Sequence, residues 1–323
     1  MHRQRSLLLL IIICGYATCL WSQQYTAMAD VLKEEHIPFP PASIPHLNAS
    51  ITSYAVLNDS NEFLIAYYLA DPITNTLKPP LYLTRYGKNT GQWQHVALDP
   101  TRVEKLTQSP YGFGSVLNVV HSGKRYYLDL HWNPSAGCLL ILNENLMPED
   151  ALLGWPRGWF RSGAVLYTRN MIHFADVHPE TLWLYDPETH ESQQLYPEQD
   201  DPFRTAFSDR LAKVINNDQC RIKNWGCDPQ DFTTELGDVD VNDTTHSVAV
   251  QVTFESEGFV DREVAENSDE WNPDEYIYVY QLQPFRWREF RREELKQKFG
   301  TEIPKQLLEP KNIEKVFATP APN

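Results

Sequence analysis

The sequence lacks any apolar run long enough to cross a bilayer. The unbroken apolar run near the start of the chain, Leu7–Cys14, holds eight residues, whereas a spanning helix needs about 20. This run follows Arg3 and Arg5 and precedes small and polar residues, which is the order of a secretory signal peptide. We therefore predict a signal peptide over residues 1–22, cleaved after Ser22. The mature protein is then secreted or periplasmic and has no transmembrane segment.

Three alternatives to this cleavage stay open. Ala27-Met28-Ala29 is a second cleavage pattern, although it lies far from the apolar run. An uncleaved segment would act as a membrane anchor. A lipoprotein would be acylated at Cys14 or Cys19, but Ile13 and Thr18 stand before them, where processing requires a small residue.

Basic residues are scarce. The sequence has 28 lysines and arginines and 43 aspartates and glutamates, which gives a net charge of −15. Loss of Arg3 and Arg5 with the signal would bring it to −17 (−15 − 2). A chain of this charge repels nucleic acids and anionic lipid surfaces. We therefore exclude nucleic-acid binding and attribute the acidity mainly to solubility.

Cysteine is also scarce: three of the five cysteines lie beyond the predicted signal. Cys220 and Cys227 enclose the short segment "CRIKNWGC", which predicts a disulfide in an oxidising compartment. Cys138 is then left unbridged, and its apolar neighbours in "CLLIL" predict that it is buried.

From Ser50 onward the sequence consists of short runs of β-forming residues separated by clusters of turn-forming residues. Four such runs, from "SYAVLND" to "QWQHVALDP", occupy the first fifty residues or so. Similar groups recur, and their third runs centre on positions 81–83, 140–142, 182–184 and 276–278. These centres are 59, 42 and 94 residues apart (140 − 81, 182 − 140 and 276 − 182). A repeat of about 40 to 50 residues with four strands is typical of a β-propeller blade.

In repeat length, four-run grouping and hairpin chemistry, residues 50–295 resemble the β-propeller superfamily, although no specific family motif is matched. The resemblance implies an all-β domain over residues 50–300, with four or five antiparallel four-stranded blades. A β-sandwich or meander is the alternative. Helical spacing in "DPFRTAFSDRLAKVINND" predicts a small helical insertion, which together with the cysteine loop occupies residues 201–228.

The ends of the chain show a different composition. Residues 23–49 are polar and proline-rich, which predicts a linker or strap on the surface. The stretch "RREELKQKFG" at 291–300 predicts a helix that ends at Gly300. Residues 301–323 show little pattern and are interpreted as a C-terminal tail.

Two aspartates precede a histidine by two positions at the ends of comparable runs. Asp129 and His131 align with Asp176 and His178, and residues two apart in a strand point to the same face. In propellers such turns lie on the face where ligand sites are common, so the resemblance implies that both pairs approach one rim. Three interpretations stay open: structural hydrogen bonds, a sugar- or peptide-binding surface that includes Trp132, and a Zn²⁺ or Mn²⁺ site.

No strong catalytic motif is present. The sequence has no G-x-S-x-G, no H-E-x-x-H, no P-loop and no G-x-G-x-x-G. No cofactor is predicted, and a divalent metal at the Asp-x-His pairs is left open. The hypothesis for function is a non-catalytic binding or scaffold module for a protein or carbohydrate ligand. The alternative is a carbohydrate-active enzyme that uses Asp129 and Asp176 as paired carboxylates, with or without a metal.

Overall fold

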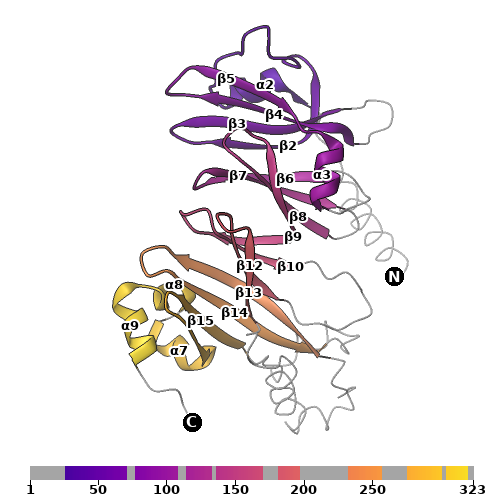
Figure 1. The fold of residues 1–323 in the computed structure, drawn as a ribbon. Helices are drawn as coiled ribbons and strands as arrows, with labels where there is room; N and C mark the ends of the chain where they lie inside the picture. Colours follow the sequence, from indigo (N-terminus) through magenta and orange to yellow (C-terminus); the bar gives the residue numbers. More distant parts are fainter. Residues whose placement is uncertain are drawn as a thin grey trace, which may run out of the picture. The chain divides into compact units, whose positions relative to one another are not determined.

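The structure is a computed structural model, and it describes residues 26–70, 77–107, 114–132, 136–169, 181–196, 232–256, 275–299 and 303–318. These residues form mainly β-strands in three open antiparallel sheets (Figure 1). The all-β prediction is therefore confirmed. The predicted signal peptide, the helical insertion at 201–228 and the cysteines Cys220 and Cys227 lie outside the described residues.

The first sheet has five strands in sequence order. They are β1 (Thr26–Ala27), β2 (Ser50–Asn58), β3 (Glu62–Ala70), β4 (Leu77–Gly87) and β5 (Gln92–Ala97). Strand β3 is buried on both faces, because its sequence "EFLIAYYLA" is apolar at nearly every position. Strands β2 to β5 coincide with the first predicted group of four runs. Helix α3 (Pro100–Thr107) follows β5.

The second sheet differs from the predicted blades. Its seven strands run in reverse sequence order from β12 to β6. They are β6 (Ser115–Ser122), β7 (Arg125–Trp132), β8 (Ala136–Leu142), β9 (Pro148–Trp159), β10 (Val165–Arg169), β11 (Leu182–Asp186) and β12 (Glu191–Tyr196). The second and third predicted groups are joined because β9 pairs with β10, with Trp159 opposite Val165 and Gly154 opposite Arg169. The described strands therefore do not separate these groups into two blades.

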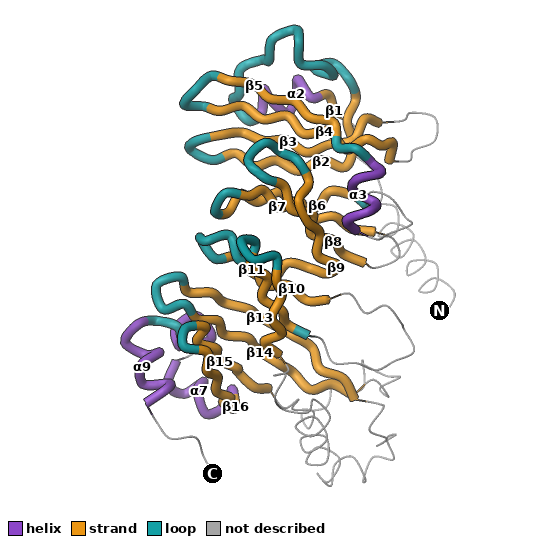
Figure 2. The backbone as a smooth tube through the Cα atoms, in the orientation of Figure 1, coloured by secondary structure: helices purple, strands orange, loops and turns teal. Residues whose placement is uncertain are grey.

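The third sheet has four strands in sequence order, and three helices lie beside it (Figures 1 and 2). The strands are β13 (Phe232–Asn242), β14 (Ser247–Ser256), β15 (Glu275–Leu282) and β16 (Phe285–Arg291). The helices are α7 (Arg292–Phe299), α8 (Ile303–Leu307) and α9 (Pro310–Ala318). The strands match the fourth predicted group, and α7 matches the helix predicted at 291–300. None of the described helices is long and apolar enough to span a membrane.

The contacts within the chain divide it into two compact units. The first comprises Met1–Val120, Tyr126–Ser135 and Leu142–Glu149; the second comprises His121–Arg125, Ala136–Ile141 and Asp150–Asn323. One apolar cluster of the first unit lies on one face of the first sheet and includes Ile51, Phe63 and Ile65. The second unit has two apolar clusters on the β13–β16 sheet, one around Tyr276, Tyr278 and Tyr280 and one around Ile277 and Val279. Cys138, in the second unit, is buried as predicted.

Both ends of the chain depart from the predicted linker and tail. Helix α2 (Met28–Glu34) lies in the region predicted as a surface strap, yet Met28 and Leu32 are fully buried in the first core. The physical reason is the spacing of Met28, Val31 and Leu32, which places three apolar side chains on one helix face. At the other end, Ile303 of α8 and Ile313 of α9 are buried in the second unit, so residues 303–318 contribute helices to its core.

Candidate functional site

The structure places only part of the predicted ligand set. Asp129 and His131 lie two residues apart on β7, and Trp132 is the last residue of that strand. The alternation of a strand therefore directs the Asp129 and His131 side chains to the same side. Asp176 and His178 lie outside the described residues, so convergence of the two Asp-x-His pairs stays a prediction.

Asp129 has an unusual environment for a carboxylate. Its Oδ1 atom is buried, and no described residue donates a hydrogen bond to it. Burial raises the pKa of Asp129 from an ordinary 3.8 to about 6, because removal from water disfavours the charged form. A carboxyl group with this pKa can donate a proton at mildly acidic pH.

This carboxyl predicts a pH-dependent change in stability for Asp129→Asn. The folded chain binds the Asp129 proton more tightly than the unfolded chain does, so ionisation opposes folding. The penalty is absent below pH 3.8, grows between pH 3.8 and about 6, and is complete above that pH. Because the group is only partly buried, we expect asparagine to raise the free energy of unfolding by about 1 kcal/mol at pH 7.5.

Urea unfolding of the two proteins at pH 7.5 and at pH 4 measures this difference. The gain is expected at pH 7.5 and should shrink toward zero at pH 4. An equal effect at both values would show that ionisation of Asp129 does not oppose folding. His131→Asn, on the same strand, is the matched control for substitution on this side of β7.

A cluster of four rings in the first unit was not predicted from the sequence. We call His46, Tyr67, Tyr82 and His95 the His–Tyr cluster. Tyr82 is at its centre: its ring stacks on Tyr67 at 5.6 Å between centroids and on His95 at 5.7 Å. The His46 ring meets Tyr82 edge-on at 4.6 Å. Strand pairing assembles the cluster, since Tyr67 lies opposite Tyr82 and Thr84 lies opposite His95.

Each imidazole of the cluster forms a hydrogen bond with a neighbouring hydroxyl group. The Nδ1 atom of His95 is 2.8 Å from Thr84 Oγ1, and the Nδ1 atom of His46 is 3.4 Å from the Tyr67 hydroxyl. Burial lowers the pKa of His46. Burial, and secondarily the nearby His46, lowers the pKa of His95. Both imidazoles are therefore neutral at pH 7. Burial also raises the pKa of Tyr67 to about 12, so its hydroxyl keeps its proton.

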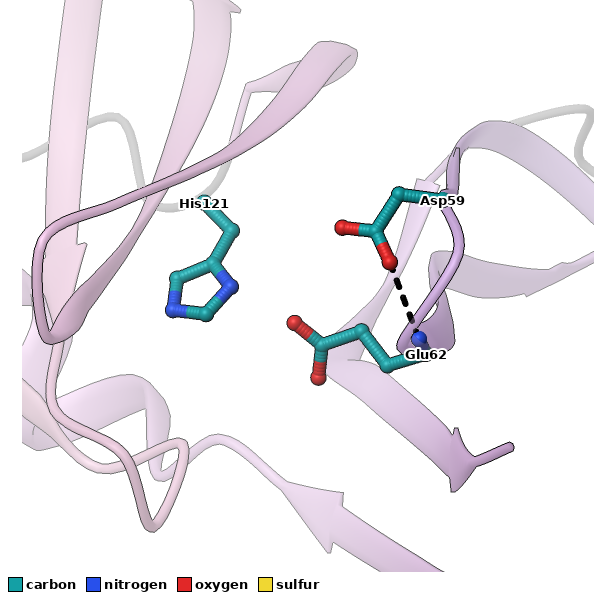
Figure 3. Close-up of side chains that lie close together, drawn as sticks. All are labelled: Asp59, Glu62 and His121. Atoms are coloured by element: carbon teal, nitrogen blue, oxygen red, sulfur yellow. Dashed lines mark hydrogen bonds between the residues drawn. The ribbon is translucent and has the colours of Figure 1, made fainter. Parts of the chain in front are cut away.

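A second polar cluster in the first unit centres on the Tyr126 hydroxyl. The Tyr126 hydroxyl donates to Glu62 Oε2 at 2.5 Å and accepts from Arg85 Nη1 at 2.8 Å. Burial and the hydrogen bond to Glu62 raise the pKa of Tyr126. Asp59 begins the turn before Glu62 and accepts the Glu62 backbone N–H at 2.9 Å (Figure 3). These contacts stabilise the hairpin of β2 and β3. His121, also drawn in Figure 3, belongs to the second unit.

In the second unit, the turn between β11 and β12 makes a comparable network. The Tyr185 hydroxyl donates to Asp150 Oδ2 at 2.7 Å and is 3.2 Å from His190 Nδ1. Arg125 forms an ion pair with Glu188 at 2.6 Å in the same turn. These contacts connect the β11–β12 turn to Asp150 of β9 and to Arg125 of β7.

The last strand, β16, presents a partly exposed aromatic and basic surface. Phe285 and Trp287 are 46% and 37% exposed and, two residues apart, lie on the same side of the strand. The Trp287 ring is 6.1 Å from that of Tyr278, which limits its freedom. Arg288 and Arg291 make no ion pair or hydrogen bond with any described residue. We call Phe285, Trp287, Arg288 and Arg291 the β16 surface.

Comparisons with known proteins give no family. No protein-family model matches the sequence, and no curated protein matches it. Among solved structures, the chain is similar to a prolyl endopeptidase, with a TM-score of 0.31 and 9% identity over 71% of this chain. A post-proline cleaving enzyme from Rickettsia typhi has a TM-score of 0.35 and 12% identity over 73% of this chain. A member of the duf4221 family from Bacteroides vulgatus has a TM-score of 0.26 and 8% identity over 74% of this chain and 81% of that one.

This chain spans only 24% and 31% of the lengths of the first two proteins. At these TM-scores the similarity identifies neither a family nor an activity.

Proposed function

We propose that this chain is a secreted or periplasmic, β-propeller-like binding module without catalytic activity. We further propose that β16 receives an extended, acidic segment of a protein partner. The observation that carries the proposal is the β16 surface, which combines exposed aromatic rings with arginines that have no described partner. Tryptophan and arginine are the residues that most often dominate binding energy at protein interfaces.

The position of β16 supports an extended ligand. The strand is the last of its sheet, and among the described strands only β15 pairs with it. The other edge of such a strand offers backbone groups to which a peptide can add as a further strand. Side chains of the added peptide would then alternate between the two sides of the sheet and meet Trp287 on one side and Arg288 on the other.

Charge determines which partner fits. The whole chain carries −15, yet four of the seven residues 286–292 are arginines. Arg286 packs on Phe317, with its guanidinium carbon 4.3 Å from the ring centroid, and Arg292 pairs with Glu275 at 2.6 Å. Arg288 and Arg291 have no partner among the described residues, so we assign them to the ligand. A second copy of β16 would bring arginines together, and like charges on paired strands are unfavourable. An acidic partner is therefore favoured over self-association.

Peptide binding tests this proposal directly. A fluorescein-labelled peptide of alternating threonine and glutamate is titrated with the purified protein at low ionic strength, and its fluorescence anisotropy is measured. We expect it to bind at least about tenfold more tightly than a peptide of alternating threonine and lysine. Trp287→Ser should weaken binding about tenfold, and the double variant Arg288→Glu/Arg291→Glu should reverse the peptide preference.

The charge control is Lys105→Glu on helix α3, a basic residue of the first unit. This variant should bind the acidic peptide as the unmodified protein does. Equal affinity for the two peptides, or an equal loss in the control and the arginine double variant, would contradict the proposal.

The raised pKa of Asp129 favours one alternative, a carbohydrate-active enzyme. A general acid in a glycosidase has this property, but the reaction also needs a second carboxylate nearby. The sequence pattern indicates Asp176 as the candidate for that second carboxylate. Hydrolysis of nitrophenyl glycosides at pH 5–7 that is lost in Asp129→Asn would establish the alternative, and the absence of such hydrolysis favours the binding module.

A further inference from the structure

We propose that His46 and His95 form a site for a divalent transition-metal ion that prefers imidazole ligands, Zn²⁺ or Cu²⁺. The proposal is independent of the β16 surface. It rests on the distance between the two rings, the hydrogen bonds to their Nδ1 atoms, and the backbone conformation of His46.

The distance between the rings suits a shared ion. The ring centroids of His46 and His95 are 5.7 Å apart and their planes are at 71°. An imidazole nitrogen binds Zn²⁺ at about 2.1 Å, which places two rings on a tetrahedral ion with their centroids about 5 Å apart. The observed separation of 5.7 Å exceeds this distance by less than about 1 Å.

The hydrogen bonds leave the correct nitrogen for the ion. Each Nδ1 atom lies beside a hydroxyl oxygen, that of Thr84 for His95 and that of Tyr67 for His46. With the proton on Nδ1, the hydroxyl oxygen accepts it and Nε2 keeps its lone pair. No described residue forms a hydrogen bond with either Nε2 atom. Histidines that bind metals almost always use the second ring nitrogen in this way.

The backbone of His46 is held in an uncommon conformation. Its φ is +72°, a left-handed value that residues other than glycine rarely adopt. The turn is closed by a hydrogen bond from the Ala49 N–H to the His46 carbonyl at 2.9 Å. This conformation orients the His46 ring toward Tyr82 and His95. Strain of this kind is concentrated at functional sites.

Two imidazoles leave coordination positions for water or for a ligand atom. We therefore expect an open site of moderate affinity, and one that binds Cu²⁺ more tightly than Zn²⁺. The Tyr67 and Thr84 hydroxyls act as positioning groups, since they orient the ligands without contacting the ion.

The test uses the untagged full chain after removal of metals with a chelator. Cu²⁺ is added, and electron paramagnetic resonance is recorded; Zn²⁺ affinity is measured by calorimetry. We expect a Cu²⁺ spectrum with nitrogen coupling from two imidazoles, and at least a tenfold loss of Zn²⁺ affinity in His46→Ala and in His95→Ala. Thr84→Val should weaken binding less, about threefold. His95→Gln, which is closer in size, provides a second variant if His95→Ala fails to fold.

The histidine control is His190→Ala, which should bind Zn²⁺ as the unmodified protein does. The proposal is overturned if the protein binds neither ion. It is also overturned if the His46 and His95 variants bind with unchanged affinity, or if a control variant loses as much affinity as they do.

Discussion

Replacement of Gly154 by alanine is expected to destabilise the second unit by about 3 kcal/mol or more. A Cβ atom at this position would lie 1.8 Å from the carbonyl oxygen of Thr168. That oxygen belongs to the backbone of β10, so the clash cannot be relieved by rotation of a side chain. Relief would require β9 and β10 to separate where Gly154 lies opposite Arg169.

Gly237→Ala is the matched control in the same unit. There a Cβ atom would lie 3.4 Å from the nearest atom of the Gln251 side chain, an ordinary contact. Urea unfolding at pH 7.5 measures both variants. We expect Gly237→Ala to stay within about 1 kcal/mol of the unmodified protein. If Gly154→Ala did the same, the pairing of β9 with β10 would be disproved.

Leu32→Ala is expected to lower the free energy of unfolding of the first unit by about 3 kcal/mol. The Leu32 side chain is fully buried and packs in the cluster that contains Ile51, Phe63 and Ile65. Truncation removes apolar surface from this cluster and leaves a cavity between helix α2 and the sheet. The effect would show that the chain before β2 is part of the core.

Lys33→Ala, the next residue of α2, is the control. Lys33 is exposed, and alanine is the best helix former, so the change in stability should be within about 0.5 kcal/mol. Thermal unfolding followed by circular dichroism compares the two variants. Equal melting temperatures for Leu32→Ala and Lys33→Ala would mean that α2 is only a surface strap.

The strands were largely predictable because each is a local pattern. A run such as "EFLIAYYLA" between two polar turns predicts a strand whatever it pairs with. The grouping of strands into blades was less predictable. The spacing of a repeat does not determine whether the last strand of one group, β9, pairs with the first strand of the next, β10. Helix α2 was not predicted, although Met28, Val31 and Leu32 have helical spacing. The prolines that follow it at positions 38–45 make the composition of residues 23–49 typical of a linker.

The candidate sites also differ in how far the sequence alone predicts them. The density of arginines in β16 can be read from the sequence, whereas the unpartnered Oδ1 of Asp129 depends on burial, which no short motif encodes. His46 and His95 are 49 residues apart (95 − 46) and belong to no motif. They meet because the register of β3, β4 and β5 aligns Tyr67 with Tyr82 and Thr84 with His95. Strand register of this kind follows from the whole sheet, not from either histidine's neighbours.

Amide hydrogen exchange, measured with and without the acidic peptide, tests the central proposal that β16 receives an acidic strand. Addition of the peptide as a strand would form new backbone hydrogen bonds along Phe285–Arg291 and slow exchange there. We predict that protection increases in β16 with the threonine–glutamate peptide and not with the threonine–lysine peptide. Unchanged exchange in β16 in the presence of bound acidic peptide, or equal protection by both peptides, would contradict the account.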